Sequence, residues 1–251
     1  MDSLGFVKKS ALYKTIFNWY PYRVRISVSE HASAFQKRAF YKGKALKKEL
    51  SHYTVGEYYG FNQEWYHDFT MNKGGCAATT AAEACLLFKK NFGIDSLYPY
   101  DPQNVTFEDF SRFAMAMKPY LRPRLTGVDR LSLYTEGLSR YFHDAGVSRI
   151  SIQEFSGNET ADDAAAVLIR QIDEGYPVPF LLLAHEDRSL YDFIWHWFLL
   201  NGYEKDETGL KVKAASYGEY VWLDFYHLWD TGSGRKGGMI LFHIDEDNEQ
   251  H

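Results

Sequence analysis

Cys76 is the residue whose surroundings most favour chemistry. It follows the flexible pair Gly74-Gly75 and begins an expected helix, and the small residues Ala77-Ala78 come directly after it. The free N–H groups and the dipole at a helix N-terminus favour a thiolate, the reactive form of cysteine. Cys76 is therefore a candidate nucleophile. The alternative is a buried structural cysteine, which is what we expect of Cys85 inside the same helix.

His196 is the second candidate, within the apolar run FIWHWFLLNGYE. We expect a strand here that ends in a turn at Asn201-Gly202. A thiolate nucleophile needs an imidazole at hydrogen-bond distance, as base and counter-ion. A lone histidine would more often be a core residue. The order of a cysteine at a helix start, a histidine on a strand 120 positions later (196 − 76) and further strands favours a catalytic pair.

The elements that must position this pair are helices first and strands later. Beyond the cysteine helix, which stops at Gly93, helical spacing and caps predict helices at about 107–118, 129–145 and 161–174. After residue 176 the chain changes to short β-branched or aromatic runs separated by turn residues, and an earlier run, RVRISVSE, also alternates like a strand. This order predicts an α+β fold in which an antiparallel sheet packs against helices.

Aromatic residues flank both parts of the expected site. Because alternate strand residues share a face, Trp195 and Trp197 should lie opposite His196, and we interpret them as core residues. Tyr217 and Trp222 are either core residues or walls of a cleft. The high aromatic content, 17% of the 251 residues, requires a thick core or a broad apolar cleft.

The net charge, the apolar runs and the cysteine spacing argue against a nucleic-acid-binding, membrane-spanning or disulfide-linked protein. The formal net charge is −5, so the sequence has no electrostatic footprint for nucleic acid. No run approaches the roughly 18 apolar residues of a membrane span. The two cysteines would be about 13 Å apart along one helix, at roughly 1.5 Å per residue, too far for a disulfide. Free thiols and the lack of an N-terminal secretory pattern predict a cytoplasmic protein, although a leader removed earlier would leave no trace.

No cofactor is expected. Four histidines of the C-terminal half, His185, His196, His227 and His243, lack the spacing of a zinc site. We interpret His227 and His243 as surface or sheet-edge residues. The Gly-Gly pairs lack the pattern of a phosphate-binding loop.

The segments around both candidates resemble a known family. NKGGCAATTAAEACLLF is similar to the nucleophile segment of papain-like bacterial cysteine peptidases, including the bacteriocin-processing (double-glycine) group and the streptopain group. HWFLLNGYE resembles their histidine segment, and ASYGEYVWLDF the strand–turn–strand that follows it. The likeness covers about residues 62–90 and 177–244. It implies a papain-like fold with one domain over 1–251, a mainly helical lobe over 1–175 and a sheet lobe over 176–246.

The resemblance also implies a residue that orients the imidazole and one that stabilises the oxyanion. Where the family has Asn or Asp, this sequence has Ser216, and Asp224 on the next strand is the other candidate. For the oxyanion, the family usually places Gln or Asn shortly before the cysteine. We choose Asn72, together with the Cys76 N–H, over Gln63, which lies thirteen residues upstream of the cysteine.

The implied activity is hydrolysis of a peptide or amide bond by a cysteine peptidase acting on a peptide or protein substrate. Two alternatives remain at this point. The same pair could serve an amidase or acyltransferase, or the fold could be an inactive papain-like module that binds a peptide or a partner. Residues 1–60 are either an integral part of the helical lobe or a propeptide-like cover.

Overall fold

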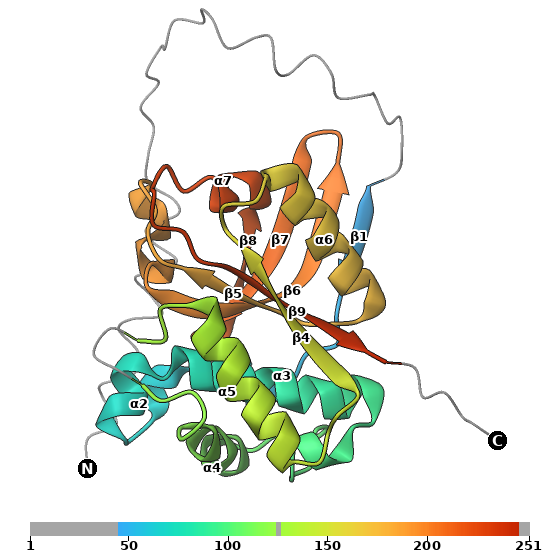
Figure 1. The fold of residues 1–251 in the computed structure, drawn as a ribbon, viewed down its shortest axis with the longest axis vertical. Helices are drawn as coiled ribbons and strands as arrows, with labels where there is room; N and C mark the ends of the chain where they lie inside the picture. The colour runs from blue at the N-terminus through green and yellow to red at the C-terminus, as the bar shows by residue number, and fades with distance from the viewer. Residues whose placement is uncertain (1–44, 124–126, 246–251) are drawn as a thin grey trace, which may run out of the picture. The chain divides into compact units, whose positions relative to one another are not determined.

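The computed structural model describes residues 45–123 and 127–245, all within one compact unit, Lys42–His251. The strand expected in RVRISVSE lies outside the described residues. Figure 1 shows a twisted sheet with helices on both sides. The helices are α2 (Phe69–Gly74), α3 (Cys76–Phe92), α4 (Phe107–Met117), α5 (Leu131–Asp144), α6 (Ala161–Glu174) and α7 (Phe225–Trp229), with short 3-10 turns at Gln63–Trp65, Asp95–Leu97 and Arg188–Phe193.

The expected α+β class is confirmed: helices pack against an antiparallel sheet. The strands are β1 (Leu46–Glu49), β4 (Ile150–Ser156), β5 (Val178–Leu182), β6 (His196–Asp206), β7 (Gly209–Ser216), β8 (Glu219–Asp224) and β9 (Gly238–Ile244), with a separate two-stranded pair, β2 (Thr54–Val55) and β3 (Tyr58–Tyr59). The order in the large sheet is β4-β9-β5-β6-β7-β8, and β1 pairs with β6.

Helices cover both faces of the sheet, and successive residues of β6 divide between two hydrophobic cores. Trp197 and Leu199 pack with α3, α4 and α5, whereas Phe198 and Leu200 pack with α6 and α7. This alternation follows from the opposite directions of neighbouring side chains in a strand. It explains why HWFLL reads as a continuous apolar run rather than an alternating one.

The predicted helices form where local signals place them. Thr106 caps α4 by accepting from the Asp109 N–H, and Thr160 caps α6 in the same way. Gly175 adopts a left-handed conformation at the end of α6, and Gly93 does so after α3. Such caps satisfy helix ends without help from distant residues, so they can be predicted from sequence.

Two expectations about strands are wrong. Asn201-Gly202 is not a turn: β6 runs through it to Asp206, with a register shift between Leu200 and Gly202. Glycine is favoured there because β1 passes so closely that an added Cβ would lie 3.0 Å from the Lys48 carbonyl oxygen. In addition, the expected order of helices first and strands later does not hold throughout, because β1 and β4 precede residue 176 and join the same sheet.

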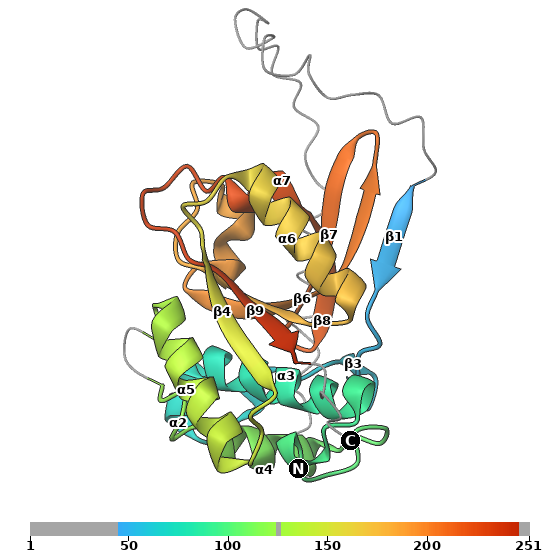
Figure 2. The same cartoon turned by 45° about the vertical axis from the view of Figure 1, so that its right-hand side comes forward.

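Figure 2 shows α3 below the sheet, with the N-terminal end of β6 passing over it. Cys76 and His196 are the first residues of α3 and β6, respectively. In the described part of the chain, no helix is both long and apolar enough to span a membrane.

Candidate functional site

The junction between α2 and α3 sets the position of Cys76. Gly75 separates the two helices and donates its N–H to the Met71 carbonyl oxygen at 2.9 Å. A Cβ at position 75 would lie 2.4 Å from that oxygen, so no other residue fits the junction without movement. The result is a cysteine on the first turn of α3 that is only 6% exposed.

The two free cysteines differ in what surrounds the sulfur. Backbone N–H groups of Cys76, Ala77 and Trp197 point at the Cys76 sulfur and lower its pKa, but burial outweighs them and raises it. Cys85 is fully buried, and its thiol pKa is raised well above the ordinary value with no hydrogen bond to oppose burial. Both are thiols in this closed state, and Cys76 alone of the two has donors ready for a thiolate.

His196 is held by its pairing with β5 and by two hydroxyl groups. Its partner in the β5–β6 register is Leu182. Its Nε2 lies 2.7 Å from the Ser216 hydroxyl, and its Nδ1 lies 3.5 Å from the Tyr217 hydroxyl. Burial lowers the pKa of the imidazole to about 3, so the ring is neutral at pH 7.

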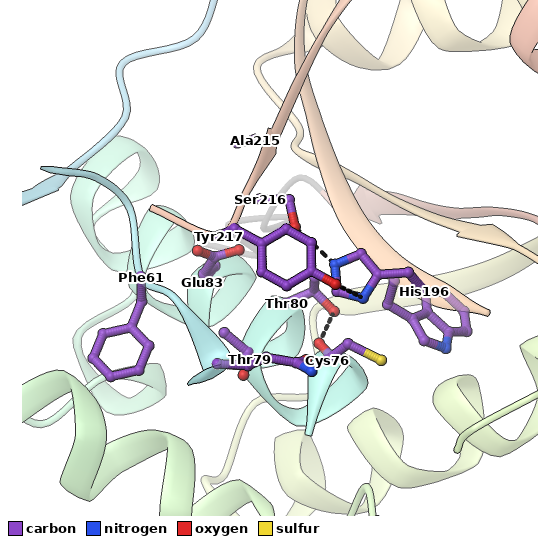
Figure 3. Close-up of a pocket in the computed structure, with 11 residues that line it drawn as sticks. Phe61, Cys76, Thr79, Thr80, Glu83, His196, Ala215, Ser216 and Tyr217 are labelled. Carbon is purple, nitrogen blue, oxygen red and sulfur yellow. Dashed lines mark hydrogen bonds between the residues drawn. The ribbon is translucent and has the colours of Figure 1, made fainter. Parts of the chain in front are cut away.

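Cys76 and His196 meet at one small pocket (Figure 3). Its lining comes from α3, β6, β7 and the segment before α2, and comprises Phe61, Gln63, Cys76, Thr79, Thr80, Glu83, His196, Trp197, Ala215, Ser216 and Tyr217. The pocket leaves about 10 Å³ for the centre of a water molecule, which is room for about one water. Among the described residues, the hydrogen-bond partners of the imidazole are Ser216 and Tyr217, not the cysteine sulfur.

Tyr217 closes the pocket over the histidine. Its ring stacks on the imidazole at a centroid distance of 4.6 Å and an interplanar angle of 6°. Tyr217 and Gly218 form the turn between β7 and β8, and Tyr217 has a φ of 54°. Such a backbone conformation is uncommon for a residue with a side chain, and here a positive φ at both Tyr217 and Gly218 is what a two-residue hairpin turn requires. Of the two interpretations of Tyr217, the wall of a site is the one that the structure supports.

The tryptophans that flank the site in sequence differ in how far they are buried. Trp197 is a core residue as predicted, 1% exposed and stacked on Tyr134 of α5. Trp195 is not: it is 42% exposed, and the Arg235 guanidinium lies 4.0 Å from its ring centre. The reason is its left-handed φ of 57°, which takes Trp195 out of the strand pattern before β6 begins. Trp222 is half-buried on β8.

The structure separates the two candidates for orienting the imidazole. Ser216 contacts His196, as described above. Asp224 stands at the opposite end of β8, where it pairs with Lys211, and its carboxylate caps α7 by accepting from the His227 N–H. Among its described contacts Asp224 therefore serves a helix N-terminus and not the imidazole.

The two candidates for the oxyanion site are also separated. Asn72 is on α2, and its amide donates to the carbonyl oxygens of Glu64 and Tyr66 at 2.7 and 3.3 Å. It does not line the pocket, so the choice of Asn72 is not supported. Gln63 does line the pocket, with its Nε2 donating to the Asn72 carbonyl oxygen and its Oε1 buried without a partner.

Glu83 is the pocket residue that the motifs do not indicate. It lies seven residues after Cys76 on α3, so both side chains face the same side of the helix. It is 4% exposed, accepts from the Tyr53 hydroxyl at 2.8 Å, and has its pKa raised to about 7 by burial. The available signal was a single carboxylate within the apolar run AAEACLL at helical spacing from the cysteine.

The remaining histidines of the C-terminal half lie away from the pocket. His227 Nε2 lies 2.7 Å from the Asp187 carboxylate and its side chain is half exposed, and His243 is exposed on β9, as predicted for both. The described residues contain no group of three or more His, Cys, Asp or Glu placed to hold a metal ion. His185 contacts the backbone of His227.

Comparison with known proteins adds no assignment to this geometry. The chain matches no protein-family model, no curated protein and no solved structure. What can be said of its activity therefore rests on the motifs in the sequence and on the contacts within this pocket.

Proposed function

We propose that this protein is a papain-like cysteine peptidase that cleaves a peptide or amide bond. The observation that carries the proposal is the convergence of Cys76, at a helix N-terminus, and His196, oriented by Ser216, on one pocket. Cys76 would attack the carbonyl carbon, and His196 would take the thiol proton and pass it to the leaving amine. Water would then release the acyl group from the sulfur.

Support for the oxyanion site comes from two kinds of donor. The backbone N–H groups of Cys76 and Ala77 already point at the sulfur. The Gln63 side chain is the amide that reaches the same pocket. Donors that are fixed before the reaction stabilise the developing charge without the cost of reorganisation. In place of Asn72, Gln63 would contribute the N–H of its Nε2 that is not donated to the Asn72 carbonyl oxygen.

The closed pocket favours a second candidate, a papain-like module that binds a peptide or partner without catalysis. Cys76 and His196 are 6% and 5% exposed, and both are neutral in this state. A catalytic cycle therefore requires Tyr217 to move away from the imidazole. A binding module would have no need of that movement.

Thiol labelling in an opened site distinguishes the two candidates. Tyr217→Ala removes the ring over His196, and iodoacetamide labelling of each cysteine is followed by mass spectrometry from pH 5 to 9. We expect Cys76 to label at least about tenfold faster than Cys85 at pH 7, equivalent to one pKa unit in thiolate fraction. Adding His196→Ala should slow Cys76 labelling by about tenfold at pH 7, whereas the exposed control His243→Ala should leave its rate unchanged.

Cleavage itself is tested with a mixture of unstructured peptides, with Cys76→Ala as the inactive control. Products that appear only with Cys76 present support the peptidase. If Cys76 labels no faster than Cys85 in the opened variant and no peptide is cleaved, the catalytic proposal fails and the binding module replaces it.

A further inference from the structure

Glu83 is the ionisable group of the pocket that the mechanism above does not use. Its carboxyl is held by the Tyr53 hydroxyl and by the backbone N–H of Phe61. Among its interactions with the described residues there is no lysine or arginine. A buried carboxylate is costly unless a cation or several donors compensate its charge, so a positive charge that forms nearby would stabilise it.

The positions of the protons on His196 and Ser216 indicate how the Glu83 carboxylate would interact with a positive charge on the imidazole. If Nδ1 takes the thiol proton, Nε2 must already carry a proton and donate it to the Ser216 hydroxyl oxygen at 2.7 Å. The Ser216 hydroxyl then has its own proton to donate, and a buried donor requires an acceptor. In the pocket lining, acceptor atoms are provided by the Glu83 carboxyl and by Gln63 Oε1.

The pocket has room for the link between these groups. Its free space suits about one water, and a buried water typically makes two to four hydrogen bonds. Thr80 would not compete for the carboxylate, because its hydroxyl already donates to the carbonyl oxygens of Cys76 and Ala77. A single water can thus accept from Ser216 and donate to Glu83.

We propose that Glu83 is a positioning residue for His196, acting through one water and the Ser216 hydroxyl. The inference rests on the proposed function. In this arrangement Nε2 keeps its proton, Nδ1 takes the proton of the thiol, and the anionic form of Glu83 exchanges no proton during the transfer. The Asn or Asp that papain-like motifs place beside the histidine would be replaced here by a carboxylate on the nucleophile's own helix.

Glu83 is distinguishable by titration from the groups that face it. The phenols of Tyr53, Tyr66 and Tyr134 have pKa values raised by burial, so they stay protonated below pH 9. His52, which approaches Glu83 across Gly60, has a pKa lowered to about 3 by burial and by the charges of Lys213 and Lys90. The Glu83 pKa of about 7 thus falls in a range where these neighbours do not titrate.

The test is ¹⁵N NMR of the histidine rings in the full chain, from pH 5 to 9, with His196 assigned by its loss in His196→Gln. We expect His196 to show the Nε2-protonated neutral tautomer and a shift step near pH 7, although the ring itself does not titrate there. Glu83→Gln should abolish the step. Ser216→Ala should also abolish it, because the link is broken while Glu83 is intact.

Tyr53→Phe is the matched control. It removes a contact of Glu83 but keeps the carboxyl, and because the Tyr53 hydroxyl lowers the pKa of Glu83, the step should move to higher pH. A purely structural role for Glu83 predicts that the His196 step survives Glu83→Gln. That result, or an Nδ1-protonated tautomer in the wild-type chain, overturns the inference.

The readout is independent of catalysis. Cys76→Ser should retain the step, because the link does not include the sulfur. If the step is present but Cys76 is unreactive in the labelling assay, that result contradicts the proposed function and not this inference. Should Glu83→Gln fail to fold, which the dispersion of its spectrum reveals, Ser216→Ala decides the question alone.

Discussion

At the scale of single residues, the surroundings of Cys76 and His196 set their protonation. Burial raises the pKa of the thiol and lowers that of the imidazole to about 3, so the closed pocket holds a neutral pair. Desolvation disfavours both charged forms. The donors and the hydroxyl that would stabilise the charged pair are already in position, so under the proposed function opening of the pocket would be the step that activates it.

Ser216 provides a prediction at this scale. Ser216→Ala leaves Nε2 of a buried histidine without its hydrogen-bond partner, which should destabilise the fold by about 1–3 kcal/mol. In the Tyr217→Ala background, Ser216→Ala should also slow Cys76 labelling by about tenfold, which is the effect of raising the pKa of the Cys76 thiol by about one unit. Urea unfolding and the labelling assay measure the two effects.

The controls for Ser216 are a conservative and a distant variant. Ser216→Thr keeps a hydroxyl and should retain most of the labelling rate, while Ser189→Ala, in an exposed 3-10 turn, should change neither quantity. Unchanged labelling in Ser216→Ala would show that the hydroxyl does not position the imidazole.

At the scale of elements, the site depends on how α2 and α3 are joined. A Cβ at Gly75 would meet the Met71 carbonyl oxygen at 2.4 Å, and that oxygen is also the hydrogen-bond acceptor that ends α2. Neither helix can shift alone, because α3 is buried along most of its length. The first turn of α3 is therefore fixed relative to β6.

Gly75→Ala tests this coupling. Overpacking should cost about 1–3 kcal/mol of stability, and displacement of Cys76 from the Trp197 N–H should slow its labelling in the opened variant. Gly234→Ala is the matched control, since an added Cβ there meets nothing within 4 Å. If Gly75→Ala is as stable and reactive as the control, the junction does not position the nucleophile.

At the scale of the whole molecule, the sheet buried on both faces leaves ionisable groups deep in the protein. Glu83 is one of them, and its pKa rises from 4.5 to about 7 on folding. Below pH 4.5 the carboxyl is protonated in both states. As the pH rises to about 7, the unfolded chain releases this proton while the folded protein retains it, so Glu83 reduces stability across that window.

Glu83→Gln should remove this loss. The difference in free energy of unfolding between Glu83→Gln and the wild-type chain should grow by about 1.4 kcal/mol for each pH unit above 4.5, to about 3 kcal/mol in total. Above pH 7 the difference should stay constant. His196 and His52 have lowered pKa values and act in the opposite direction, but they are present in both proteins and cancel. Urea unfolding at pH 4.5 to 8 measures the difference.

The exposed carboxylate of Glu136 on α5 offers a control for that series. Glu136→Gln should follow the wild-type pH dependence throughout. A constant difference between Glu83→Gln and the wild-type chain at every pH would mean that Glu83 is not a protonated acid in the folded protein.

The sequence by itself determined the features that local forces decide. The helices near 107–118, 129–145 and 161–174 begin and end at caps formed by neighbours such as Thr106 and Gly175. The placement of Cys76 at a helix start was likewise readable, because Gly74-Gly75 and the apolar periodicity after it are local signals.

Tertiary structure alone decided which polar groups share the pocket. Asn201-Gly202 has the sequence of a turn, yet the close approach of β1 makes it a bulge within β6. Which of Ser216 and Asp224 reaches His196, and which of Gln63 and Asn72 faces the pocket, depends on strand register and chain crossing. Register and crossing arise from contacts between segments far apart in sequence, and burial of Glu83 arises in the same way.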